Sequence, residues 1–246
     1  EDFPCQIAQV GMWLMDHQMN TRAAEQFGTY YARLPLTQSA TIVHGNALRI
    51  DWEEVVPKRE LSYILGNPPF VGHKNVNPTQ KQEMIDVFNG KQGRLDYVSA
   101  WYKKAAEMIV GTSIECAFVS TNSIVQGVHI ELLWGLLFDY YGIHINFAHT
   151  TFKWSNEAKG KASVFCVIVG FSTVDRNRKR LFVYEDIAGM PIEKIVKKIN
   201  AYLNDGEAVI VQSRNTTLCD VPKMIYGNIP RDGGHYTFTD DEKMNF

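Results

Sequence analysis

The chain has 246 residues, of which 45% are hydrophobic and 21% are charged. This composition is typical of a globular protein and not of a disordered one. With 25 Lys and Arg against 27 Asp and Glu, the net charge of −2 excludes a generally basic nucleic-acid coat protein. It does not exclude a DNA enzyme, because one local basic patch is enough to neutralise phosphates.

Membrane, disulfide and metal chemistry are all poorly supported by the sequence. No apolar run approaches the roughly 20 residues needed to cross a bilayer, and no signal peptide is visible at the start. The four cysteines lie far apart without a C-x-x-C pair, and the seven histidines show no ligand spacing. We therefore expect reduced thiols, no metal, no membrane partner and a cytoplasmic location.

Hydrophobic spacing and turn residues predict the following elements in chain order. Helices are expected at residues 4–19, 96–110 and 129–141 and around the apolar stripe of Ile192, Ile195, Val196 and Ile199. Strands are expected at residues 41–44, 61–65, 114–120, 143–149, 162–171 and 181–184.

The middle of the chain thus alternates strands with helices, which predicts an α/β fold with a mostly parallel, doubly wound sheet. In such sheets, ligands bind at the carboxyl ends of the strands. Asn46 and Asn67 both follow a predicted strand directly. We therefore expect both asparagines to lie at the site.

A change in composition near Ser172 predicts two domains. Residues 1–172 are expected to form the catalytic domain, and residues 173–246 a linker and the beginning of a second domain. The linker holds a basic cluster of Arg176, Arg178, Lys179 and Arg180. This cluster could contact DNA phosphates, and a solvated linker explains it equally well.

The most informative tetrapeptide is Asn67-Pro68-Pro69-Phe70, which directly follows an apolar strand. Taken alone, it is explained as well by a rigid turn with a local asparagine cap. The α/β context and the second asparagine at Asn46 favour a functional interpretation.

In that context the tetrapeptide resembles the catalytic motif of the DNA amino-methyltransferases. Further segments resemble that family in order: residues 42–48, 96–109, 116–127 and 152–162. The nearest resemblance is to MmeI-like type II restriction–modification enzymes, through residues 16–20 and the Pro222–Gly234 run. It covers most of the chain and implies a Rossmann-like class I methyltransferase sheet with an antiparallel hairpin near its C-terminal end, followed by the start of a target-recognition domain.

The resemblance also implies an activity: adenine-specific, site-specific DNA methyltransferase (EC 2.1.1.72), with S-adenosylmethionine as cofactor and double-stranded DNA as partner. Asn46, Ala47 and Asn67 would contact the cofactor, Asn46 by its side chain and Ala47 by its backbone. Phe152 or Trp154 would be a second aromatic residue against the target base, with Phe152 slightly preferred.

The chemistry of the motif can be argued from its residues. Adenine N6 is a poor nucleophile because its lone pair is delocalised into the ring. The Asn67 side-chain oxygen and the Pro68 carbonyl can each accept one of its N–H groups, which frees that lone pair. Phe70 can stack on the base, which must be flipped out of the duplex. Methyl transfer is then direct and depends on positioning and electrostatics.

One family feature is missing from the sequence. No Gly-x-Gly turn follows a first strand, and no acidic residue ends a second one, so we interpret the chain as a fragment without the first strands. Their absence would leave unpaired sheet edges. We expect the isolated chain to bind S-adenosylmethionine weakly or not at all, to be inactive or impaired, and to have edges that favour self-association.

Three alternatives remain. Cytosine N4 methylation uses the same motif, so the choice of adenine depends on the resemblance. Cytosine C5 methylation is disfavoured, because no cysteine follows the equivalent strand. RNA or a protein glutamine could be the methyl acceptor, although the Pro222–Gly234 run favours DNA. A non-catalytic DNA-binding module is the alternative from another class.

Overall fold

The computed structural model describes residues 2–28, 40–154, 164–214, 216, 219–221 and 243. Its helical segments are α1 (Asp2–Phe27), α2 (Trp52–Val55), η1 (Lys58–Glu60), α3 (Pro78–Phe88), α4 (Ser99–Ile109), η2 (Asn122–Val125), η3 (Ile130–Trp134) and η4 (Leu136–Tyr140). Its strands are β1 (Tyr63–Gly66), β2 (Glu115–Thr121), β3 (His144–Trp154), β4 (Val164–Ser172), β5 (Lys179–Val183) and β6 (Ile192–Val196). These elements belong to one compact unit that extends to Val211, and residues from Gln212 onward form a second.

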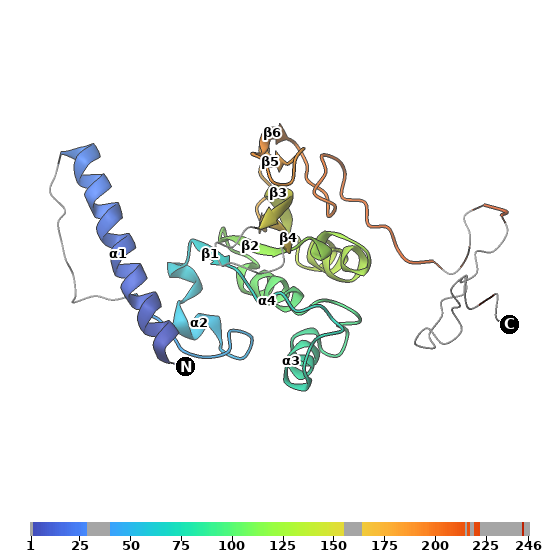
Figure 1. Ribbon diagram of the computed structural model, residues 1–246, viewed down its shortest axis with the longest axis horizontal. Coiled ribbons are helices and arrows are strands. Elements are labelled where there is room, and N and C mark those ends of the chain that lie inside the picture. The colour runs from blue at the N-terminus through green and yellow to red at the C-terminus, as the bar shows by residue number, and fades with distance from the viewer. Residues whose placement is uncertain are drawn as a thin grey trace. The chain divides into compact units, whose positions relative to one another are not determined.

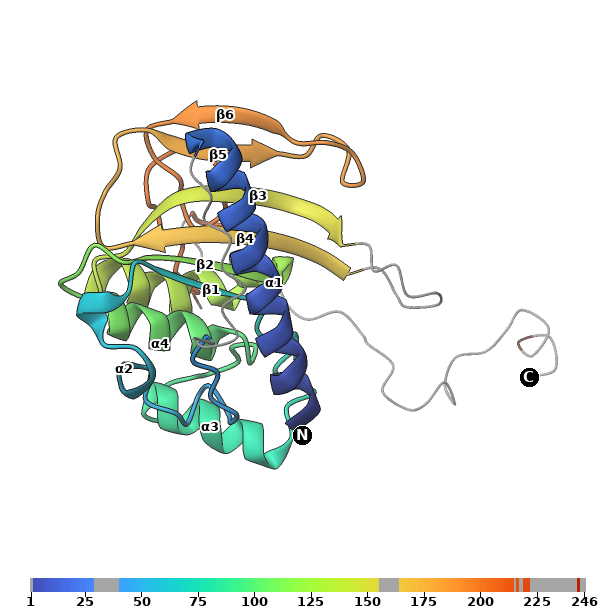
Figure 2. The same cartoon turned by 90° about the vertical axis from the view of Figure 1, so that its left-hand side faces the viewer.

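The six strands form one mixed sheet in the order β1-β2-β4-β3-β5-β6 (Figures 1 and 2). Among the described strands, β1 with β2 and β3 with β5 pair in parallel, and the other neighbours pair antiparallel. The α/β class and the antiparallel hairpin of β3 and β4 are confirmed, and the sheet is mixed in the part described. Strands β1, β2, β3 and β5 run in one direction, so their carboxyl ends meet at one edge.

The core lies between α4, the π-helical segments η3 and η4, and one face of the sheet. Tyr102 of α4 is fully buried there, and its ring stacks on Phe171 of β4 with centroids 5.4 Å apart. The same ring meets Phe118 and Trp134 edge-on at 5.2 and 5.7 Å. The alternating burial of β2 results from this packing, since one face of that strand is covered and the other is only partly covered.

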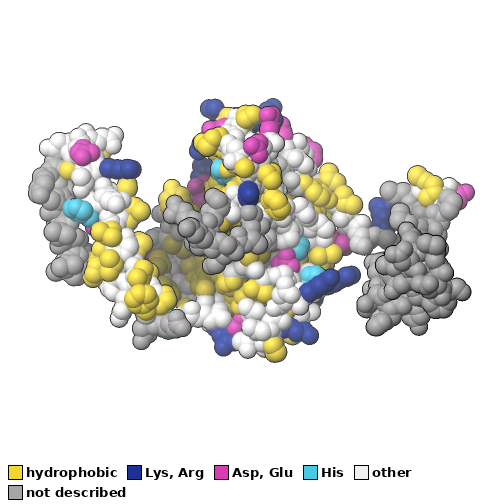
Figure 3. Space-filling view, viewed as in Figure 1, with side chains coloured by type: hydrophobic (Ala, Val, Ile, Leu, Met, Phe, Trp, Pro, Cys, Tyr) yellow, Lys and Arg dark blue, Asp and Glu magenta, His cyan; other side chains and the backbone are white. Residues whose placement is uncertain are grey.

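Most of the predicted elements are confirmed. The first helix is longer than expected, and its side chains at Ile7, Val10 and Leu14 are more than half exposed in the structure. Figure 3 shows the hydrophobic side chains gathered along this helix. Within the described residues, no helix has the length and apolar character that a membrane span requires.

Two predicted elements are wrong. Residues 41–44 form no strand, because no described strand lies beside them to share a hydrogen-bond ladder. The predicted helix at 192–199 is strand β6, which pairs antiparallel with β5 from Lys179↔Val196 to Val183↔Ile192. Its β-branched Ile192, Ile195 and Val196 favour a strand, and over such a short run helical spacing does not decide.

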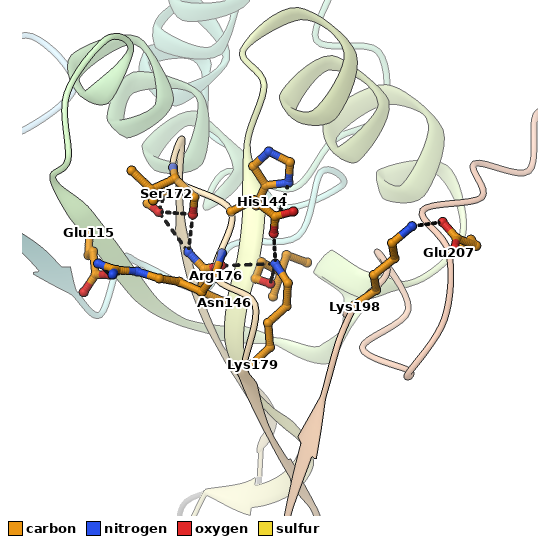
Figure 4. Close-up of polar contacts among 11 residues, drawn as sticks. Glu115, His144, Asn146, Ser172, Arg176, Lys179, Lys198 and Glu207 are labelled. Atoms are coloured by element: carbon orange, nitrogen blue, oxygen red, sulfur yellow. Dashed lines mark hydrogen bonds and ion pairs between the residues drawn. The ribbon is translucent and has the colours of Figure 1, made fainter.

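Residues beyond 172 also belong to the sheet, since β5 and β6 extend it on the β3 side. The segment that the sequence analysis assigned to a linker is therefore partly structural. Lys179 shows this most clearly, because its side chain is only 4% exposed. Its ammonium group donates to the Ile145 carbonyl and to Asn146 Oδ1, both at 3.1 Å, and to Asp175 Oδ1 at 2.6 Å (Figure 4).

We predict that Lys179→Met lowers the free energy of unfolding by about 1–3 kcal/mol, because buried acceptors lose their donor. Urea unfolding followed by circular dichroism measures this change. The matched control is Arg180→Met, which removes an exposed cation one residue away and should cost about 1 kcal/mol or less. Equal losses in the two variants would contradict the structural role of Lys179.

Candidate methyl-transfer site

A cavity of about 470 Å³ lies where β1 ends. Its wall includes Gly66, Asn67, Pro68 and Pro69 from the predicted motif and Ala47 from the loop after the predicted strand at 41–44. The remaining wall is mostly apolar, with Trp52, Leu61, Ile64, Trp101, Met108 and Phe118 among its side chains. The structure therefore brings the two loops together, as the position of each asparagine after a strand led us to expect.

The motif leaves β1 in an arrangement that keeps its polar groups available. Pro68 is buried, whereas Asn67 is exposed and Phe70 is partly exposed. The Val71 N–H donates to the Pro69 carbonyl at 3.2 Å. Among the hydrogen bonds of the described residues, none involves the Asn67 amide or the Pro68 carbonyl. Both oxygens are thus free to accept hydrogen bonds from a ligand.

Gly66 is required because the chain passes very close to the core at this point. A Cβ on Gly66 would lie 3.0 Å from the Phe118 ring. That distance is shorter than a normal carbon–carbon contact. The ring of Phe118 therefore supports the backbone directly before Asn67 and fixes where the motif begins.

The loop that carries Ala47 is held by its own hydrogen bonds. Asn46 Oδ1 accepts the Leu48 N–H at 2.9 Å, and Asn46 Nδ2 donates to Glu83 Oε1 at 2.8 Å. Trp52 Nε1 donates to the Ala47 carbonyl at 2.8 Å. Both ends of the Asn46 amide are thus engaged within the protein, and its side chain shapes the loop.

Lys104 of α4 ties the same loop to the core. Its ammonium group donates to the Leu48 carbonyl at 3.0 Å and to the Ile50 carbonyl, and it lies 5.4 Å from the centre of the Trp52 ring. Partial burial lowers the pKa of Lys104, while Asp51 and Glu107 oppose that shift. Helix α4 therefore positions Ala47 through a cation as well as through packing.

The two predicted aromatic residues lie elsewhere on the sheet. Phe152 and Trp154 belong to the last part of β3, at the same carboxyl edge as β1, but neither lines the cavity. Phe152 stacks on Tyr184 with centroids 5.2 Å apart, and His149 donates to or accepts from the Tyr184 hydroxyl at 3.0 Å. Tyr184 and His149 were missed by the sequence analysis, since nothing local connects them to Phe152.

The basic cluster is largely neutralised within the protein. Arg176 pairs with Glu115 at 2.7 Å, and Arg180 pairs with Glu193 at 2.7 Å. Lys179 is buried, so its predicted contact with DNA phosphates is not supported by the structure. Arg178 is exposed and has no partner among the described residues.

Other predicted segments lie outside the described residues. They are residues 155–162 of the aromatic-bearing hairpin and the Pro222–Gly234 run of the expected recognition domain.

Comparison with known proteins identifies the class of this chain. Residues 1–183 match the family described as the MmeI DNA-methyltransferase domain, and residues 205–246 match the MmeI target recognition domain. The fold and the motif after β1 thus belong to a DNA-methyltransferase domain of the restriction–modification type. The chain belongs to the MmeI family.

Two relatives support this assignment. The solved structure of the type IIL restriction–modification enzyme MmeI in complex with DNA is 49% identical, with a TM-score of 0.89, and covers 100% of this chain and 33% of that one. DNA methyltransferase A of Bacillus subtilis (strain 168) is 42% identical over 247 residues, which are 97% of this chain and 27% of that protein. The chain therefore spans about a third or less of the relatives that it matches.

One titratable group lies buried beside the site. His129 Nε2 accepts the Asp96 backbone N–H at 3.0 Å, which requires that nitrogen to be unprotonated. Burial lowers the pKa of His129, and His73 adds to this effect. The Asp96 carboxylate and a hydrogen bond to the Gln126 backbone oppose it.

We predict that the protein loses stability as the pH falls below about 6.5, the ordinary pKa of histidine. The unfolded chain takes up a proton at His129 before the folded chain does, so protons favour unfolding until the folded pKa is reached. Thermal unfolding between about pH 7.5 and 5 measures the slope. In His129→Gln the slope should be smaller, whereas His17→Gln on exposed helix α1 should leave it unchanged. Equal slopes in all three proteins would contradict the assignment to His129.

Proposed function

We propose that this chain carries the site that transfers a methyl group from S-adenosylmethionine to N6 of adenine in DNA, within a restriction–modification or related defence system. One observation carries this proposal: the Asn67-Pro68-Pro69 segment ends β1 and lines the same cavity as Ala47. Membership of the MmeI family supports DNA as the substrate. Such an enzyme would act in the bacterial cytoplasm, where the DNA is.

The target amine would be held by oxygens that the protein leaves free. The Asn67 side-chain oxygen and the Pro68 carbonyl would accept the two N–H groups of the adenine amine, which removes its lone pair from conjugation. The buried ring of Pro68 and the turn from Pro69 to Val71 hold that carbonyl in place. Because these acceptors are preorganised, they cost little reorganisation during methyl transfer.

Phe70 would stack on the flipped base, since it follows the two prolines and is partly exposed. Phe152, with Trp154 as the second choice, would contact that base from β3. Its stacking on Tyr184 limits the rotation of the Phe152 ring. The base must leave the duplex for its amine to reach Asn67.

The cavity residues fit the cofactor. A cavity of about 470 Å³ with a mainly apolar wall is in the range of small-molecule sites. Ala47 and Trp52 would pack against its adenine ring, and Asn46 would fix the Ala47 backbone that faces that ring. The cofactor supplies an electrophilic methyl group on a sulfonium centre. Asn67 is the residue that this chain places between the cofactor side and the base side.

The decisive variant is Asn67→Ala. We predict a loss of methyl transfer of about 100-fold or more, because one preorganised acceptor for the target amine is removed. Binding of S-adenosylmethionine should change by less than about threefold, since the apolar wall remains. The complete gene product is incubated with methyl-labelled cofactor and unmethylated DNA, and the DNA is digested to nucleosides.

The control is Asn204→Ala, an exposed asparagine outside the cavity, which should methylate like the wild type. Label in N6-methyladenosine supports the proposal, and label in N4-methylcytosine would move the target to cytosine. Cofactor binding without label in DNA would move the acceptor to RNA or protein. A protein that binds DNA and no cofactor would be a non-catalytic module.

A further inference from the structure

We propose that Asp96 and Tyr97 are positioning residues that fix the two site loops relative to each other, Asp96 for the loop of Asn67 and Tyr97 for the loop of Ala47. This inference rests on the proposed function. Both residues lie directly before α4 and are buried, at 8% and 3% exposure. Neither lines the cavity, so neither acts by touching a ligand there.

Asp96 connects three separate segments. Its Oδ1 accepts the backbone N–H of His73 at 2.9 Å, in the loop that follows the Asn67 motif. Its Oδ2 accepts the Ser123 hydroxyl at 2.7 Å, just after the carboxyl end of β2. Its own backbone N–H donates to His129 at 3.0 Å. One carboxylate thus holds the loops after β1 and β2 together.

Tyr97 connects the other side. Its backbone N–H donates to the Val71 carbonyl at 2.9 Å, four residues after Asn67. Its hydroxyl donates to Glu83 Oε2. Burial, together with Glu83, raises the pKa of Tyr97 to about 12, so the hydroxyl remains a donor at neutral pH.

Glu83 of α3 passes this contact on to the cofactor loop. It is 4% exposed, and its Oε1 accepts from Asn46 at 2.8 Å and from Arg49 at 2.7 Å. Asn46 in turn fixes the turn that presents Ala47. The path from Tyr97 to Ala47 therefore consists of hydrogen bonds to one buried carboxylate.

This arrangement matters because methyl transfer needs the amine and the methyl donor in line. A displacement of about 1 Å can cost on the order of 100-fold in rate. Apolar packing allows small sliding movements, whereas buried and fully satisfied hydrogen bonds specify one arrangement. Asp96 and Tyr97 are adjacent in the chain, so they join the two loops through a single peptide bond.

The test separates the two arms in the complete gene product. In Asp96→Asn, we expect kcat for adenine methylation to fall about 10-fold or more, with the Kd for S-adenosylmethionine within about threefold. In Tyr97→Phe, we expect that Kd to rise about 10-fold, with the rate at saturating cofactor within about threefold. Ser123→Ala removes one donor to Asp96 and should lower kcat in the same direction by a smaller factor.

Tyr102→Phe is the matched control, because it removes another buried tyrosine hydroxyl of α4, which bonds Ser120 at 2.8 Å. It should lower the melting temperature without changing kcat or Kd. If Asp96→Asn does not fold, the direction of the Ser123→Ala effect decides that arm.

The inference is overturned if the wild type methylates adenine while Asp96→Asn, or Ser123→Ala in its place, and Tyr97→Phe behave like Tyr102→Phe. It is also overturned if each variant changes kcat and Kd by the same factor. If the wild type transfers no methyl group to adenine, the proposed function fails and the inference falls with it.

Discussion

The position of α4 on the sheet is set by Tyr102, whose ring lies between Phe118, Phe171 and Trp134. Its hydroxyl is satisfied by Ser120, so a polar atom is buried there without an unpaired donor. The site depends on this contact in two ways. Phe118 supports the backbone before Asn67, and α4 carries Lys104, which holds the loop of Ala47. A shift of α4 along the sheet would displace both loops together.

Two carboxylates, Glu83 and Asp96, are buried beside an otherwise apolar cavity. A buried charge is costly unless donors surround it, and each of these has them. Glu83 receives hydrogen bonds from Asn46, Arg49 and Tyr97, and Asp96 receives them from His73 and Ser123. The apolar wall supplies binding area, and the carboxylates determine which arrangement of the loops is occupied.

The sequence predicted the parts of the site that local patterns encode. The apolar run at 61–65, stopped by Gly66-Asn67-Pro68, is enough to place a strand end and a rigid turn. The strand expected at 41–44 failed because strand formation requires a neighbour, which a local pattern cannot supply. Glu83 and Asp96 were missed for a related reason. Glu83 meets Asn46 across 37 residues, and Asp96 meets His129 across 33.

The basic cluster at 176–180 shows why the local density of cations is a weak guide to DNA contact. Phosphate binding requires a charge that is exposed and not already neutralised. In the structure, Arg176 and Arg180 face carboxylates, and Lys179 replaces lost water with two oxygens of β3 and one of Asp175. The same residues therefore join β3, β5 and β6 into the sheet. The charge was visible in the sequence, but its partners Glu115 and Glu193 became apparent only once the strands were paired.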